Sequence, residues 1–195
     1  MKLRLFVGVT APEEWRSALT KWRRKIQPRF SDSFGRWTSE PNLHLTLCFF
    51  GAMEEADVVT LAGKLQTVAR RSTRFSVAPA DLGCFPNPTR PRILWLGLSG
   101  ATEALVELES RIRAASATFS KPPDNRPFHP HLTLARLKNP TRHDRDAIAE
   151  FIRRGAPIDV PAWPVNSFEL IRSEPKPEGS LYTPIATFPL AAPHS

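Results

Sequence analysis

The sequence has little cysteine and no long hydrophobic run. Its two cysteines, Cys48 and Cys84, form neither a CxxC pair nor a cysteine and histidine cluster at zinc spacing, so we expect no structural zinc. The first fifteen residues hold only a short apolar stretch containing Arg4, which is too brief for a signal-peptide core or a membrane span. We therefore expect no membrane association and a cytoplasmic location, where thiols stay reduced.

Acidic residues are also few compared with basic ones. The chain has 27 Lys and Arg against 19 Asp and Glu, a formal net charge of +8. Such an excess attracts polyanions, because a protein that neutralises phosphates releases the counterions condensed on nucleic acid. The basic runs at 23–25 and 153–154 fall on predicted helices and fit solvent-exposed faces equally well. The charge favours a nucleic-acid ligand without specifying one.

Length and hydrophobic pattern predict a folded chain with an internal duplication. At 195 residues, 41% of them apolar, the chain can form one compact domain or two tightly joined lobes. Runs rich in β-formers predict strands at 3–9, 43–50, 75–82, 93–98, 130–137, 165–172 and 182–190. Helical spacing predicts helices at about 12–27, 54–71, 101–118 and 142–153, with polar loops at 30–42 and 120–127. The two halves share one order: strand, helix, loop, strand, helix, strand.

The tetrapeptide His-Leu-Thr-Leu occurs twice, at 44–47 and at 131–134. Side chains alternate between the two faces of a strand, so His44 and Thr46 share one face and their leucine neighbours share the other. His131 and Thr133 repeat the pattern. Each motif therefore presents an imidazole and a hydroxyl on one side and anchors itself in an apolar core with the other.

Two such faces suit acid/base chemistry at a phosphate if the duplicated halves meet across a pseudo-two-fold axis. The ordinary histidine pKa lies near neutrality, so one ring can remove a proton from water while the other protonates a departing ribose oxygen. The two threonine hydroxyls can donate hydrogen bonds to the non-bridging phosphoryl oxygens. The sequence thus predicts His44 and His131 as a catalytic pair, assisted by Thr46 and Thr133.

Other interpretations of these residues remain open at this point. A histidine in a strand often serves a structural role, although two identical copies in equivalent positions argue against that. His129 and His131 lie two residues apart on one predicted face and form a candidate metal site, but no carboxylate accompanies either motif. Cys48 shares the predicted face of His44, where it is either a nucleophile or a small packing residue.

Both motifs and their flanks resemble the RNA 2′,3′-cyclic phosphodiesterase family, also called 2′-5′ RNA ligases, of the two-histidine phosphoesterase superfamily. The resemblance is carried by NLHLTLCFFG in the first half and RPFHPHLTLAR in the second, and it extends from the opening LRLFVGV to the closing LYTPIATFPL. It implies an α+β fold of two lobes within one domain spanning 1–195, with antiparallel sheets lining a central cleft and helices outside. It also implies hydrolysis of RNA 2′,3′-cyclic phosphate ends to 2′-phosphomonoesters without metal or other cofactor.

The same resemblance suggests a role for each site residue. His44 matches the family's proton donor and His131 its proton acceptor, and Thr46 and Thr133 match the second position of each motif. Joining of RNA ends through a 2′-5′ linkage would be a secondary activity. The implied partner is RNA with a cyclic phosphate end, bound by a monomer that needs no protein partner.

Neighbouring residues are candidates for substrate binding. Arg136 matches an arginine of the family, but strict alternation from His131 directs it to the opposite face unless a bulge intervenes. Arg126 lies in the preceding loop and fits either a phosphate contact or solvent. The remaining candidates, for stacking on a terminal base, are Phe50, Phe128 and Tyr182, with core packing as the alternative for the two phenylalanines.

Two other functions fit the same sequence. A module that binds RNA ends without turnover would keep the basic cleft but not the chemistry, and its binding would be sensitive to salt. A phosphodiesterase for a small cyclic nucleotide would keep the motif pair with a different substrate. The positive charge of the chain favours a polymer over a small nucleotide.

Overall fold

The computed structural model describes residues 1–119, 127–155, 158–177 and 179–193. Within these ranges the helices are α1 (Glu13–Ile26), α2 (Val58–Arg70), α3 (Thr102–Ala115) and α4 (Arg142–Arg154), and the 3-10 turns are η1 (Gln27–Arg29), η2 (Glu40–Asn42) and η3 (Glu55–Asp57). The strands are β1 (Lys2–Thr10), β2 (Gly35–Trp37), β3 (His44–Glu54), β4 (Phe75–Phe85), β5 (Ile93–Gly100), β6 (His131–Leu137), β7 (Trp163–Val165), β8 (Ser167–Lys176) and β9 (Gly179–Pro189). No described helix combines the length and the apolar character that crossing a membrane requires.

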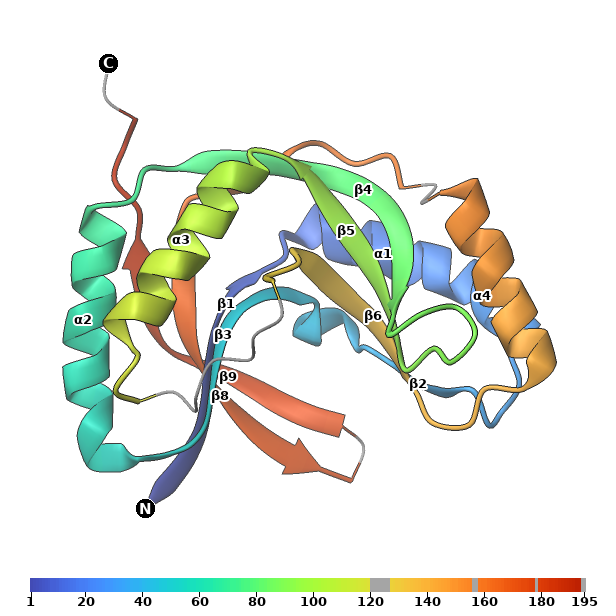
Figure 1. Ribbon diagram of the computed structural model, residues 1–195, viewed down its shortest axis with the longest axis horizontal. Helices are drawn as coiled ribbons and strands as arrows, with labels where there is room; N and C mark the ends of the chain where they lie inside the picture. Colours follow the sequence, from blue (N-terminus) through green and yellow to red (C-terminus); the bar gives the residue numbers. More distant parts are fainter. Residues whose placement is uncertain (120–126, 156–157, 178, 194–195) are drawn as a thin grey trace.

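The strands form one curled sheet with two lobes. The order is β7-β4-β5-β6-β3-β1-β8-β9. Strand β2 lies outside this order and pairs with the C-terminal part of β6. β3 and β6 are antiparallel and meet at a single residue pair, Leu45 with Leu132. The sheet curls around a central concavity on both sides of this pair, and the helices cover its outside (Figure 1). The predicted two-lobed α+β fold is confirmed, with the expected sheets joined into one.

The lobes are not the two halves of the sequence, because each half contributes a helix to the opposite lobe. Helix α1 comes before β3 yet packs on the β6 lobe, where Trp15 lies 5.3 Å from Trp163 of β7 and Trp22 lies 6.2 Å from Phe151 of α4, between ring centroids. Helix α3 comes before β6 yet packs against α2 on the β3 lobe (Figure 1). The exchange ties the lobes together.

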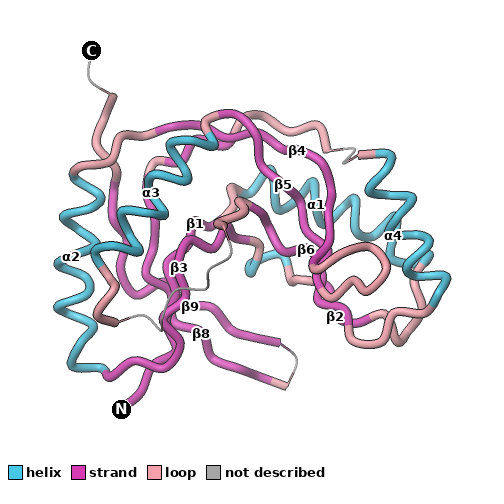
Figure 2. Tube along the Cα trace, viewed as in Figure 1, coloured by secondary structure: helices cyan, strands magenta, loops and turns pink. Residues whose placement is uncertain are grey.

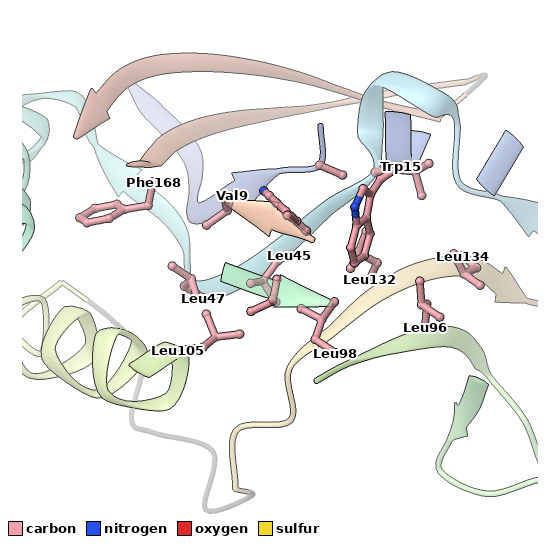
Figure 3. Packing of buried hydrophobic residues seen from close by; sticks show 14 of the residues in the cluster. Val9, Trp15, Leu45, Leu47, Leu96, Leu98, Leu105, Leu132, Leu134 and Phe168 are labelled. Carbon is pink, nitrogen blue, oxygen red and sulfur yellow. The ribbon is translucent and has the colours of Figure 1, made fainter. Parts of the chain in front are cut away.

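The leucines of both motifs enter the core. Leu45 and Leu132 are fully buried, and Leu47 and Leu134 nearly so. Figure 3 shows these side chains with Trp15 of α1 and Leu105 of α3 in one cluster. Alternation therefore leaves the motif histidines and threonines on the other side of the sheet, facing the concavity.

Several predicted element bounds differ from the structure. The predicted loop at 30–42 contains β2 and η2, and the predicted strand at 165–172 is two strands, β7 and β8. Strand β3 continues past Gly51 to Glu54, because extra residues at Leu47 and Phe50 keep its pairing with β1. Helix α2 begins only at Val58, after η3. Most of the predicted loop at 120–127 lies outside the described residues.

Candidate active site

The two motifs bring their polar side chains to one face of the sheet. The pair Leu45 and Leu132 joins antiparallel strands, so the register sets His44 opposite Thr133 and Thr46 opposite His131. Diagonal neighbours in such a ladder lie about 7–8 Å apart, which places the two imidazoles on either side of a small group. The structure therefore brings together the four residues predicted from the repeated tetrapeptide.

Both imidazoles are held by the same backbone hydrogen bond. Nδ1 of His44 lies 2.6 Å from the carbonyl oxygen of Asn42, and Nδ1 of His131 lies 2.7 Å from that of His129. A carbonyl only accepts, so each Nδ1 carries a proton and donates it. The Nε2 atom of each neutral ring is then unprotonated and is the atom that can accept a proton. Thr46 Oγ1 donates to Nε2 of His44 at 2.9 Å.

Burial lowers the proton affinity of both rings. It lowers the pKa of His44 to about 4, against the opposing effect of the Asn42 hydrogen bond, and the charges of Arg136 and His131 add to the decrease. Burial also lowers the pKa of His131, with further lowering from the charges of His129 and Arg136. The pair is therefore neutral near pH 7 without a ligand, and a bound anion would raise both pKa values.

Different aromatic side chains enclose the two histidines. The His44 ring lies 4.9 Å from Phe6 and 5.1 Å from Tyr182, between centroids. Tyr182, predicted to contact a base, is thus brought beside the first histidine by strand β9. The His131 ring lies 5.2 Å from Phe85 and 6.1 Å from Trp95.

Sequence reasoning missed three of these aromatic neighbours, Phe6, Phe85 and Trp95. Alternation in the predicted strand at 93–98 was a usable signal, since it sets Trp95 on the face opposite the leucines at 94, 96 and 98. The neighbouring glycine Gly83 makes room for the indole, because an added Cβ there would lie 2.2 Å from the Trp95 ring.

Arg136 reaches the histidine face because β6 contains a bulge. Leu94 pairs with Ala135 and Trp95 with Thr133, so Leu134 is an extra residue in the ladder. The bulge reverses the alternation and leaves Arg136 exposed beside buried Ala135. Its charge adds to the lowering of the pKa of both motif histidines, after the larger effect of burial.

Bulges in β3 decide the positions of two candidate residues: they contradict the predicted face of Cys48, and for Phe50 they favour the core-packing alternative. The extra residue Leu47 puts Cys48 opposite Val7, on the core face against α3, so it does not share the His44 face. The Cys48 thiol is largely buried, which raises its pKa, and it forms a hydrogen bond with Ser116, which directly follows α3. The extra residue Phe50 is 3% exposed in the core, so its ring has no free face for a base. Phe49 instead faces the concavity at 63% exposure.

The remaining candidates are not brought to the histidines. Phe128 is partly buried and packs against the core. Arg126 lies outside the described residues. His129 is exposed with its ring centroid 6.2 Å from that of His131, and in the described ranges no three His, Cys, Asp or Glu side chains gather as a metal site would require.

Comparison with known proteins adds independent findings. A Thermus thermophilus protein named RNA 2′,3′-cyclic phosphodiesterase is 33% identical over 205 residues, covering 98% of this chain and 92% of the relative. The crystal structure of the Thermus thermophilus protein TT0787 aligns with a TM-score of 0.80 at 31% identity, over 98% of this chain and 100% of that one. That of Escherichia coli LigT complexed with 3′-AMP aligns with a TM-score of 0.73 at 27% identity, over 97% and 99%.

The match to a family is equally extensive. The sequence model of the 2′-5′ RNA ligase superfamily matches residues 11–177, which include both tetrapeptides and the strands that carry them. The chain therefore belongs to the 2′-5′ RNA ligase superfamily.

Proposed function

We propose that this protein hydrolyses the 2′,3′-cyclic phosphate ends of RNA to 2′-phosphomonoesters, with His44 and His131 as its acid/base pair. The observation that carries the proposal is the pair of imidazoles on adjoining strands, each with Nδ1 tied to a backbone carbonyl, which leaves Nε2 as the atom that exchanges the proton. The substrate class is supported by the relative named RNA 2′,3′-cyclic phosphodiesterase.

The reaction needs one proton removed and one supplied. Nε2 of His131 takes a proton from water, whose oxygen attacks the phosphorus and forms a new P–O bond. The bond from phosphorus to the 3′ oxygen breaks, and protonated Nε2 of His44 gives that oxygen its proton. The products are a 2′-phosphate and a free 3′-hydroxyl, with His131 left protonated and His44 left neutral.

His44 must become protonated when substrate binds, because only the protonated ring can act as the acid. Its pKa of about 4 keeps the ring neutral in the free protein near pH 7. The negative charge of the cyclic phosphate, held between the rings, favours the protonated imidazole and opposes the effect of burial. The assignment of donor to His44 and acceptor to His131 comes from the family resemblance.

The charge on the phosphoryl oxygens is stabilised by groups beside the two rings. Arg136 supplies a fixed positive charge, and the Thr46 and Thr133 hydroxyls donate hydrogen bonds. Tyr182 is next to His44 and offers an aromatic edge for the terminal nucleoside. Both protons are carried by side chains, so the proposed mechanism uses no metal.

We place this activity in the cytoplasm, in a monomer, with 2′-5′ joining of RNA ends as a secondary reaction.

Histidine substitutions test the proposal directly. His44→Gln and His131→Gln should each lower kcat for a short RNA with a cyclic phosphate end by roughly 10²–10⁴-fold. The matched control is His143→Gln, because His143 is exposed on α4 and bonds only the Arg29 carbonyl in the described chain. Its activity should equal that of the unchanged protein, and addition of a chelator should not inhibit.

Two results would contradict the proposal. Full turnover in either motif variant would show that the reaction does not depend on His44 and His131 as an acid/base pair. Salt-sensitive RNA binding with no turnover in the unchanged protein would indicate a module that only binds RNA ends.

A further inference from the structure

A second concave surface lies at the far end of β6, away from the two histidines. It is a cavity of about 560 Å³ formed by three segments: the loop after β4, the turn after β6 and the first turns of α4. The loop after β4 lies beside β6 and β2 in Figure 2. Its lining residues are Pro86, Thr89, Arg90, Pro91, Arg92, Lys138, Asn139, Pro140 and Arg145.

Among the residues that the structure describes, the lining of this cavity is basic and contains no carboxylate. Arg90, Arg92, Lys138 and Arg145 are four cations drawn from three separate segments, and none forms an ion pair in the described part of the chain. Some helix arginines, by contrast, are paired with a glutamate one turn away, as Arg154 is with Glu150. Cations that line one concave surface without acidic partners raise its positive potential, which favours binding of an anion there.

The walls of the cavity are held by backbone hydrogen bonds. The Arg92 amide donates to the Phe85 carbonyl at 2.7 Å, and the Leu137 amide donates to the Arg92 carbonyl at 2.8 Å. The side chain of Asn87 accepts from the Arg90 amide at 3.0 Å and from the Thr89 hydroxyl at 2.7 Å. The loop is therefore positioned before any ligand arrives, which lowers the entropy that binding must overcome.

Positive charge connects the cavity with the candidate active site. Strand β6 runs from His131 through Arg136 to Leu137, and Lys138 follows. Arg36 of β2 is the direct cross-strand partner of Arg136, an arrangement of like charges that is unfavourable by itself. At about 3.3 Å per residue, Lys138 lies roughly 20 Å along the chain from His131, a distance that a few nucleotides can span.

We propose that this cavity binds backbone phosphates of the RNA strand, a few nucleotides to the 5′ side of the cyclic phosphate end. The inference rests on the proposed function and extends it, because it makes the enzyme selective for an RNA chain over a cyclic mononucleotide. The strand leaves the histidines over Arg136 and Arg36, and its phosphates then meet Arg92, Lys138, Arg90 and Arg145. Remote contacts of this kind raise kcat/KM for the longer substrate.

The test compares chain lengths in a doubly neutralised variant. A 2′,3′-cyclic mononucleotide and RNAs of two to ten nucleotides with a cyclic phosphate end are the substrates. Arg92→Gln with Lys138→Gln should lower kcat/KM for the longest RNA about tenfold more than for the mononucleotide. The slope of log kcat/KM against log salt for that RNA should become shallower by about 1.4, since each lost phosphate contact on a single strand removes about 0.7.

A matched control removes the same charge elsewhere. Arg70→Gln with Arg71→Gln changes two exposed arginines at the end of α2, on the other lobe. This variant should keep the dependence on RNA length of the unchanged protein. An equal loss in both double variants would show that only net charge matters, and would overturn the proposal.

Two further outcomes distinguish failure of the proposed RNA contact at the cavity from failure of the proposed function. Inorganic tripolyphosphate, the probe for a free polyphosphate, should compete with long RNA in the unchanged protein. If it binds and long RNA is turned over equally by the unchanged protein and the cavity variant, the cavity takes a free polyphosphate and the proposal is wrong. If the unchanged protein hydrolyses neither mononucleotide nor RNA, it is the proposed function that fails.

Discussion

His44 and His131 occupy the same position in the same tetrapeptide, yet the two lobes surround them differently. Each ring donates Nδ1–H to the carbonyl two residues earlier, at 2.6 and 2.7 Å. His44 is enclosed by Phe6 and Tyr182, and its pKa falls to about 4. His131 has exposed His129 beside it, and burial lowers its pKa as well.

This difference shows which properties are local and which depend on tertiary contacts. The Nδ1 hydrogen bond spans two residues, so the tetrapeptide and its preceding residues set the tautomer in both lobes. Proton affinity instead follows from the burial that neighbouring strands impose, β1 and β9 for His44 and β4 and β5 for His131. A duplicated motif can therefore contain two rings with different acid/base properties.

The largest expected effect is the loss of stability in acid. The pKa of His44 is about 4 in the folded protein and near 6.5 when the chain is unfolded, so the unfolded chain takes up the proton first as pH falls. The stabilisation is complete above about pH 6.5, and about 3 kcal/mol of it is lost by about pH 4. Urea unfolding across this range should show that His44→Gln removes this loss.

The other lobe supplies the comparison for that experiment. His131→Gln should remove a smaller part of the acid loss. Equal effects of His44→Gln and His131→Gln would mean that the two environments do not differ as the structure indicates.

The next effect concerns the space beside each ring. A Cβ at Gly8 would lie 2.8 Å from the Leu45 carbonyl oxygen and 3.4 Å from Cδ2 of His44. At Gly97, the partner of His131, the nearest atom would be the Asp81 carbonyl oxygen at 3.2 Å. Gly8→Ala should therefore cost about 2 kcal/mol and displace His44, whereas Gly97→Ala should cost less than about 1 kcal/mol. Thermal unfolding and turnover of both variants measure the contrast.

A smaller difference is expected between the two threonines. Thr46 donates to Nε2 of His44, while Thr133 has no corresponding hydrogen bond within the residues described. Thr46→Val should cost about 1 kcal/mol of stability, and Thr133→Val less than half of that. Both variants should weaken substrate binding, because both hydroxyls are proposed to contact the phosphate. Urea unfolding with KM measurement separates the two roles, and equal stability losses would contradict the asymmetry.

The smallest effect is on titration of a single ring. Tyr182→Leu should admit water beside His44 and raise its pKa by roughly half a unit, because burial is the main cause of the lowered value. The His131 signal in an NMR titration should not move, since Tyr182 contacts only the His44 side of the cleft among the described ring contacts. A shift of both signals would indicate that the rings share one environment.

The sequence by itself determined which histidines and threonines form the two motif pairs and that each pair lies on one side of its strand. Alternation of leucine with histidine and threonine needs only the two-residue repeat of a strand, so His44, Thr46, His131 and Thr133 were predicted from local pattern. The family resemblance rested on the same residues and is confirmed by the match over residues 11–177. The two-lobed α+β fold was also predicted correctly.

Only the tertiary structure decided which face of the sheet the residues after a bulge occupy, because an extra residue reverses the alternation of side chains. Bulges at Leu47, Phe50 and Leu134 exist because neighbouring strands must stay paired, and they move Cys48 and Phe50 to the core and Arg136 to the cleft. Contacts between distant segments placed Trp95 beside His131 and gathered four cations around the second cavity. Burial, which sets the pKa of each histidine, likewise arises only when the whole sheet has closed around it.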